Sequence, residues 1–110
     1  MTRADVEAIA LSLPATSKVV QWGASDVFKV GGKVFAIGGD DGVSFKVTEI
    51  AFEVLTSDGL GRQAPYCAKG QWVNIALERL EPDDARDWLA TAHGLIAAKL
   101  TRKARAELGL

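Results

Sequence analysis

The sequence predicts a two-layer α+β fold, in which helices pack on one face of an antiparallel sheet of about five strands. Two observations favour this class. Apolar residues recur at helical spacing near both ends of the chain, and β-rich runs joined by glycine turns fill residues 18–47. The expected order of elements is helix, strands, helix, loop, strand and helix. Because this order is not a repeating βαβ unit, a nucleotide-binding parallel sheet is not expected.

The first helix is expected in residues 2–13. Its apolar residues lie one turn apart, as Val6, Ile9, Ala10 and Leu13. Thr2 is the expected N-cap, with Asp5 three residues further on. Pro14 restricts the residue before it, so the helix should end there.

A continuous antiparallel meander is expected over residues 18–47. The run VFKV-GG-KVFAIGG joins two β-rich segments through Gly31 and Gly32, and glycine supplies without strain the positive φ that a two-residue hairpin turn needs. A second turn at residues 39–42 leads into VSFKV, and residues 18–22 form the expected first strand.

A short helix and an irregular loop should follow the meander. Thr48 is placed to cap a helix over residues 49–55, which Asp58 and Gly59 then end. Residues 59–70 contain three glycines and a proline, so they are expected to form a surface loop before the strand GQWVNIAL.

The last long helix is expected to begin at Pro82, because proline suits the first helical position. Gly94 inside this helix costs about 1 kcal/mol relative to alanine, which is tolerable if the helix approaches the sheet closely there. The tail LTRKARAEL either continues the helix or forms a separate last turn capped by Thr101.

Composition describes one soluble domain over residues 1–110. The chain has 48% apolar residues, 25% charged residues and a net charge of -1, from 13 basic and 14 acidic side chains. A chain of this length can bury about 65% of its surface, enough for one core. The single cysteine excludes an internal disulfide, and no apolar run approaches the length of a membrane span. A cytoplasmic protein without a membrane partner is therefore expected.

Few residues suit catalysis or metal binding. His93 is expected at the surface or boundary of its helix, and Cys67 has no partner base in the sequence around it. The acidic pairs at residues 40–41 and 83–84 are explained by turn chemistry and by the dipole at a helix start. No enzyme activity, metal or cofactor is expected.

Surface recognition remains, and basic residues are its first candidates. Around the Gly31-Gly32 turn, Phe28 should face Phe35 and Lys29 should neighbour Val34, so both faces mix apolar and basic groups. Such a mixture can stack bases while it holds phosphates, although solubility alone also explains the lysines. The candidate nucleic-acid contacts are Lys29, Lys33, Lys46, Arg62, Lys69, Arg102, Lys103 and Arg105.

Aromatic residues give a second candidate. Trp88 lies on the apolar stripe of the last long helix and is expected in the core. Trp72 follows the irregular loop and could form a platform with Tyr66, beside Arg62 and Lys69. This loop edge, Tyr66 to Trp72, is the preferred site for a protein partner or a small ligand.

The order of several motifs resembles the MmcQ/YjbR family of small bacterial proteins. The matching pieces are ALSLP, QWG, VFKVGGKVFAIGG, VSFKV, RQAPYCAKGQWV and the late helix that ends AAKLTRKARAEL. They cover nearly the whole chain in order. The positions that match the recurring pattern of the family are Phe28, Gly32, Phe35, Pro65, Tyr66 and Trp72.

The resemblance implies an architecture related to the frataxin-like α+β fold and a DNA-binding role, which is the usual label of the family. It implies no fixed catalytic or base-reading residues. Iron binding of the frataxin kind is not carried over, because the first helix offers only Asp5 and Glu7 and lacks an acidic ridge.

Two functions therefore stand side by side. The first is a non-enzymatic cytoplasmic protein that binds DNA weakly through local phosphate contacts. The alternative is a protein-interaction or small-ligand module that uses the Tyr66–Trp72 edge.

Overall fold

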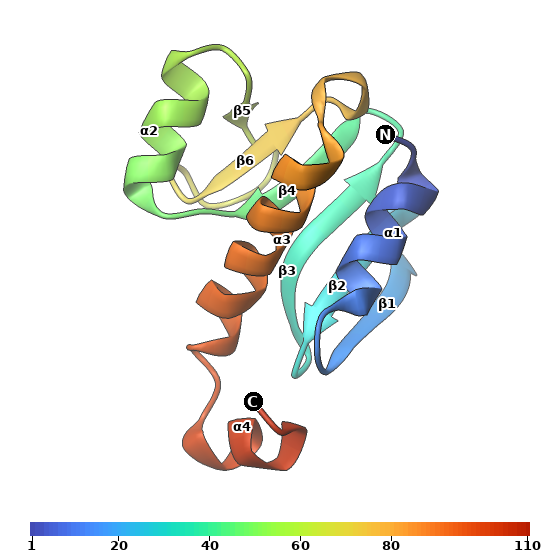
Figure 1. Cartoon of the computed structure of the whole chain (residues 1–110), viewed down its shortest axis with the longest axis vertical. Coiled ribbons are helices and arrows are strands. Elements are labelled where there is room, and N and C mark those ends of the chain that lie inside the picture. The colour runs from blue at the N-terminus through green and yellow to red at the C-terminus, as the bar shows by residue number, and fades with distance from the viewer.

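A computed structural model describes residues 1–110 of the chain (Figure 1). Its helices are α1 (Arg3–Ser12), α2 (Glu49–Ser57), α3 (Pro82–Ala97) and α4 (Arg102–Leu108), with a short 3-10 turn, η1, at Leu77–Arg79. Its strands are β1 (Thr16–Gln21), β2 (Ser25–Val30), β3 (Lys33–Gly39), β4 (Gly42–Lys46), β5 (Arg62–Gln63) and β6 (Trp72–Ile75).

The strands form one antiparallel sheet in the order β1-β2-β3-β4-β6-β5. The α+β class and the meander of β1 to β4 are confirmed. The sheet has six strands rather than about five, because Arg62 and Gln63, expected in a loop, pair with β6. The first strand also ends at Gln21 instead of Trp22, whose φ of 50° places it in the turn to β2.

The turn at Gly31 and Gly32 is confirmed, with Val30 paired to Lys33 and Lys29 paired to Val34. The expected pairing of Phe28 with Phe35 is wrong. An irregularity follows Phe28, so this residue pairs with Ala36. A bulge of this kind lets both phenylalanines reach the same core.

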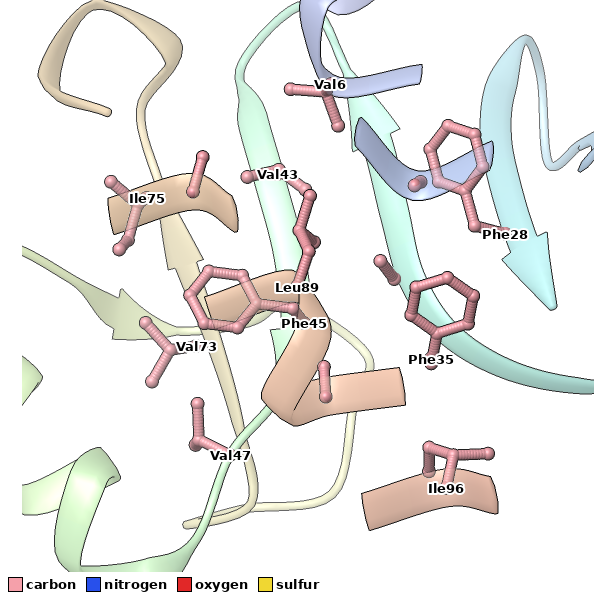
Figure 2. Packing of buried hydrophobic residues seen from close by; sticks show 14 of the residues in the cluster. Val6, Phe28, Phe35, Val43, Phe45, Val47, Val73, Ile75, Leu89 and Ile96 are labelled. Atoms are coloured by element: carbon pink, nitrogen blue, oxygen red, sulfur yellow. The ribbon is translucent and has the colours of Figure 1, made fainter. Parts of the chain in front are cut away.

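The core lies between the sheet and the helices that cover one of its faces. Figure 1 looks onto that face, with α1 and α3 in front of the sheet and α2 beyond β6. Phe28, Phe35 and Phe45 are fully buried, and Figure 2 shows them among the apolar side chains of this layer. Trp88 stacks on Phe45 with ring centroids 6.1 Å apart. Burial of these rings is the main stabilising contribution, roughly 2 kcal/mol or more for each.

His93 belongs to this core and is not the surface residue that the sequence predicted. Its side chain is 7% exposed and packs edge-on against Phe35, with ring centroids 5.5 Å apart. The ring Nε2 lies 2.7 Å from the carbonyl oxygen of Pro14, so it must donate a proton to that oxygen. This bond ties the end of α1 to α3.

The local signals for helix ends are confirmed. Thr2, Thr48 and Thr101 accept hydrogen bonds from backbone amides in the first turns of α1, α2 and α4, and Pro82 begins α3. The explanation offered for Gly94 is wrong, because a Cβ there would meet nothing within 4 Å.

The C-terminal tail forms the separate helix α4, which folds back onto the β2–β3 hairpin. A Cβ on Gly31 would lie 2.7 Å from Leu100 Cδ1 and 3.1 Å from Leu108 Cδ1. Two reasons therefore require glycine at position 31: its φ of 57°, and the close approach of the leucine side chains. The contact fixes the place of α4 at the lower end of the molecule in Figure 1.

No helix is long and apolar enough to cross a membrane.

Gly42 provides a test of the packing between the β3–β4 turn and β6. Its φ is 143°, and a Cβ there would lie 2.4 Å from the backbone oxygen of Ile75. We expect Gly42→Ala to lower the free energy of unfolding by at least about 2 kcal/mol, measured by urea denaturation. Gly39→Ala is the matched control, since Gly39 pairs with Gly42 and has open space at its Cβ. Equal stability of the two variants would contradict this account.

Candidate binding surfaces

The packing of α4 gathers basic residues at one end of the molecule. We call Lys29, Lys33, Arg102, Lys103 and Arg105 the basic end. The two lysines flank the hairpin turn that Leu100 and Leu108 contact, and the arginines follow on α4. None of these five side chains takes part in an ion pair.

Lys46 does not belong to the exposed basic surface that the sequence predicted. It is only 8% exposed, and its Nζ donates a hydrogen bond to the side chain of Gln71. Burial, together with the nearby charge of Lys99, lowers the pKa of Lys46. A lysine with this environment is poorly placed to contact a phosphate.

The second surface is the sheet face opposite the helices. A hollow of about 940 Å³ lies on it, which we call the open-face hollow. Its walls are the β1–β2 turn with Trp22, the β3–β4 turn and the loop at Pro65–Cys67. Its floor is formed by side chains of β3, β4 and β6, among them Ile37, Ser44, Trp72 and Asn74.

Three aromatic side chains line this hollow. Tyr66 is fully exposed, Trp22 is 65% exposed and Trp72 is half-buried. The structure thus brings the predicted pair of Tyr66 and Trp72 together at one hollow and adds Trp22 to them. An exposed aromatic ring contributes little buried apolar area to folding, so a ligand that covers the ring can still gain the free energy of burying it.

Gln63 holds the loop that carries Tyr66. Its side-chain Nε2 donates to the carbonyl oxygens of Ala64 at 2.9 Å and Cys67 at 3.2 Å. Its Oε1 accepts from the amide of Gly70 at 2.9 Å. One amide side chain thereby ties both ends of an irregular loop, which fixes the wall of the hollow.

A row of polar side chains crosses the floor of the hollow. Asn74 Nδ2 donates to Ser44 Oγ at 3.1 Å, and Asn74 Oδ1 accepts from Arg62 Nε at 3.4 Å. Both Ser44 and Asn74 are buried. The outer groups of this row are donors, because Ser44 keeps its hydroxyl proton and Arg62 keeps its Nη protons. Arg62 has no acidic partner.

Arg3 of α1 holds the opposite wall. Its guanidinium donates to the carbonyl oxygen of Ala24 at 2.6 Å and to Asp40 at 3.0 Å, and it lies 3.2 Å from Asp26. The hydrogen bond with Asp40 contributes most to raising the pKa of this guanidinium. A single side chain therefore fastens the β1–β2 turn to the β3–β4 turn.

Backbone strain concentrates at the same hollow. The non-glycine residues with positive φ are Ala15, Trp22, Ala24 and Tyr66, and the last three line the hollow. Each such residue costs on the order of 1 kcal/mol, and such strain clusters at functional sites. The fold tolerates it here because Arg3 and Gln63 hold the two walls.

Cys67 also lines the hollow, and it is the only cysteine of the chain. Its side chain is half-buried, and burial raises the pKa of the thiol. A raised pKa leaves little thiolate at neutral pH, so this cysteine is not activated. No group of three or more His, Cys, Asp or Glu side chains could hold a metal ion.

The candidate residues from the sequence thus fall into separate groups. The basic end holds five of them, whereas Arg62 lines the hollow and Lys69 lies exposed on the neighbouring loop. Reasoning from sequence missed Gln63, Arg3 and Asn74, because their roles depend on hydrogen bonds that no motif records. Gln63 lay inside the loop expected over residues 59–70, and no local signal distinguished it.

Comparison with known protein families assigns the chain to a family. The sequence model of the YjbR family matches residues 11–95, so the chain belongs to the YjbR family. This confirms the resemblance found in the motifs. Comparison with curated proteins finds no match.

A solved structure shares the fold. The crystal structure of the Deinococcus radiodurans protein DR2400, whose domain is described as DUF419, aligns with a TM-score of 0.87. The alignment covers 99% of this chain and 88% of that chain, with 24% sequence identity. At this identity the likeness supports the fold alone.

Alkylation of Cys67 tests the environment of the hollow. The thiolate is the form that reacts with iodoacetamide. Because the pKa of Cys67 is raised, the rate of alkylation should increase at a higher pH in the folded protein than in urea. Mass spectrometry over about pH 7 to 10 would follow the reaction. A folded-state profile at the same or lower pH would contradict the burial of this thiol.

Proposed function

We propose that this YjbR-family protein is a non-enzymatic cytoplasmic protein that binds nucleic acid weakly through the basic end. The observation that carries the proposal is the packing of Leu100 and Leu108 on Gly31, which brings basic helix α4 to the hairpin turn flanked by Lys29 and Lys33. A DNA-binding role is also what the family resemblance implies.

Electrostatics limits the affinity of such a surface. The net charge of the whole chain is -1, so attraction to a polyanion comes from the local cluster alone. Glu107 is the only acidic residue of α4. About five phosphate contacts give modest affinity that falls steeply with salt, through release of counterions.

The environments of the single histidine and the single cysteine favour a binding function over catalysis. His93 is occupied by its bond to Pro14 inside the core, and burial raises the pKa of Cys67. Neither is poised for proton transfer or attack on a substrate.

A second candidate function is binding of a small ligand or protein segment at the Tyr66–Trp72 edge. The observation that favours it is the open-face hollow, whose volume of about 940 Å³ lies within the usual range for ligand sites. The relation of the fold to frataxin-like proteins stays a prediction.

Charge removal on α4 tests the first function. Replacing Lys103 and Arg105 together by glutamine should weaken binding to duplex DNA and reduce the slope of log Kd against log salt by up to about 2. Glutamine keeps the helix propensity of α4. Fluorescence anisotropy with a labelled duplex, over about 50 to 200 mM salt, measures both effects.

The matched control replaces Arg79 and Arg86 by glutamine, which removes the same charge from η1 and α3. This control should leave the salt slope unchanged. The proposal fails if the chain does not bind at about 50 mM salt, or if the two double variants lose affinity equally.

A further inference from the structure

We propose that the open-face hollow binds an unpaired nucleobase together with its phosphate, and that the base is one carrying an exocyclic amino group. The inference rests on the proposed nucleic-acid function and extends it to a second surface. The same chemistry occurs in a free nucleotide and in an exposed base of a single strand.

The aromatic wall supplies the stacking surface. Tyr66 is fully exposed, yet its backbone is held at a φ of 61° by a loop that Gln63 fastens. The core gains nothing from this ring, so packing does not explain the strain. Because the backbone that carries this ring is fixed before binding, a flat base can stack on the ring without the cost of ordering the loop.

The polar floor supplies hydrogen-bond donors. The orientation of the Asn74 amide is set by its bonds to Arg62 and Ser44, so the free protons of the row are those of the Ser44 hydroxyl and the Arg62 Nη atoms. Ring nitrogens, carbonyl oxygens and phosphate oxygens are acceptors that match these donors. Arg62 has no competing carboxylate partner.

The β3–β4 turn supplies acceptors. Asp40 and Asp41 both line the hollow, and Asp41 makes no ion pair. The free carboxylate of Asp41 disfavours a bare anion and can accept hydrogen bonds from an amino group, whereas Asp40 is already paired with Arg3. A ligand that presents an amino group on a flat ring and a phosphate elsewhere satisfies both sides, whereas inorganic phosphate satisfies one.

Adenosine 5′-monophosphate is the probe for the experiment, followed by tryptophan fluorescence and by the rate of Cys67 alkylation. We expect a fluorescence change that saturates and a slower alkylation, since Trp72 and Cys67 both line the hollow. Uridine 5′-monophosphate should bind more weakly, and inorganic phosphate should give neither signal.

Two variants and their controls localise the binding. Tyr66→Ala removes an exposed ring, and Arg62→Gln removes the positive charge and the guanidinium Nη donors; each should weaken the binding of adenosine 5′-monophosphate about tenfold. Ile50→Ala and Arg86→Gln remove an exposed apolar side chain and an exposed charge outside the hollow. These controls should bind like the unaltered protein. Equal binding by all four variants would overturn the proposal.

Nucleic-acid arms separate this inference from the proposed function. A single-stranded oligonucleotide should lose affinity in Tyr66→Ala, while duplex binding at the basic end stays unchanged. Duplex binding without any nucleotide signal at the hollow would overturn the inference and leave the proposed function standing. A nucleotide signal without DNA binding would overturn the proposed function and leave the hollow as a site for a free nucleotide.

Discussion

The alternation of side chains along β4 and β6 is the constraint on which both the core and the open-face hollow depend. Val43 and Phe45 point toward the helices, and the residue between them, Ser44, points away. Neighbouring β6 repeats the pattern with Asn74 on the outer face. Because α1 and α3 both cover the same face of the sheet (Figure 1), the hollow on the other face is shaped by turns and one loop. A slip of one residue in this pairing would turn the polar side chains toward the helices and the apolar side chains of the core toward the outer face.

Features that depend on local backbone chemistry could be read from the sequence. The Gly31-Gly32 turn, the cap at Thr48 and the helix start at Pro82 follow from residues next to one another. The strand β5 and the burial of His93 could not be read in this way. Each depends on a partner from another part of the fold, β6 for the strand and the carbonyl of Pro14 for the histidine. The period of apolar residues records which face is buried, but it does not record which polar group finds a buried partner.

The candidate surfaces show the same division. Tyr66 and Trp72 could be selected because Trp72 follows the irregular loop that carries Tyr66, and both residues line the hollow. The two sets of basic residues could be listed from the sequence, but their separation could not. It depends on the reversal of the chain after Leu100, which turns α4 back onto the hairpin instead of extending α3. Lys46 illustrates the limit, since its position in a strand gave no sign that it would be desolvated beside Lys99.

The bonds of Gln63 to the loop have a consequence for how proteins with this scaffold can diverge. Its amide bonds to backbone atoms of Ala64, Cys67, Ala68 and Gly70, so these bonds do not depend on the side chains of the loop. Substitutions of the exposed side chains of this loop, Tyr66 and Lys69, can therefore change what the wall of the hollow recognises while the bonds of Gln63 are kept. Specificity and folding are encoded at different positions, which makes this loop a natural place to introduce new recognition by design.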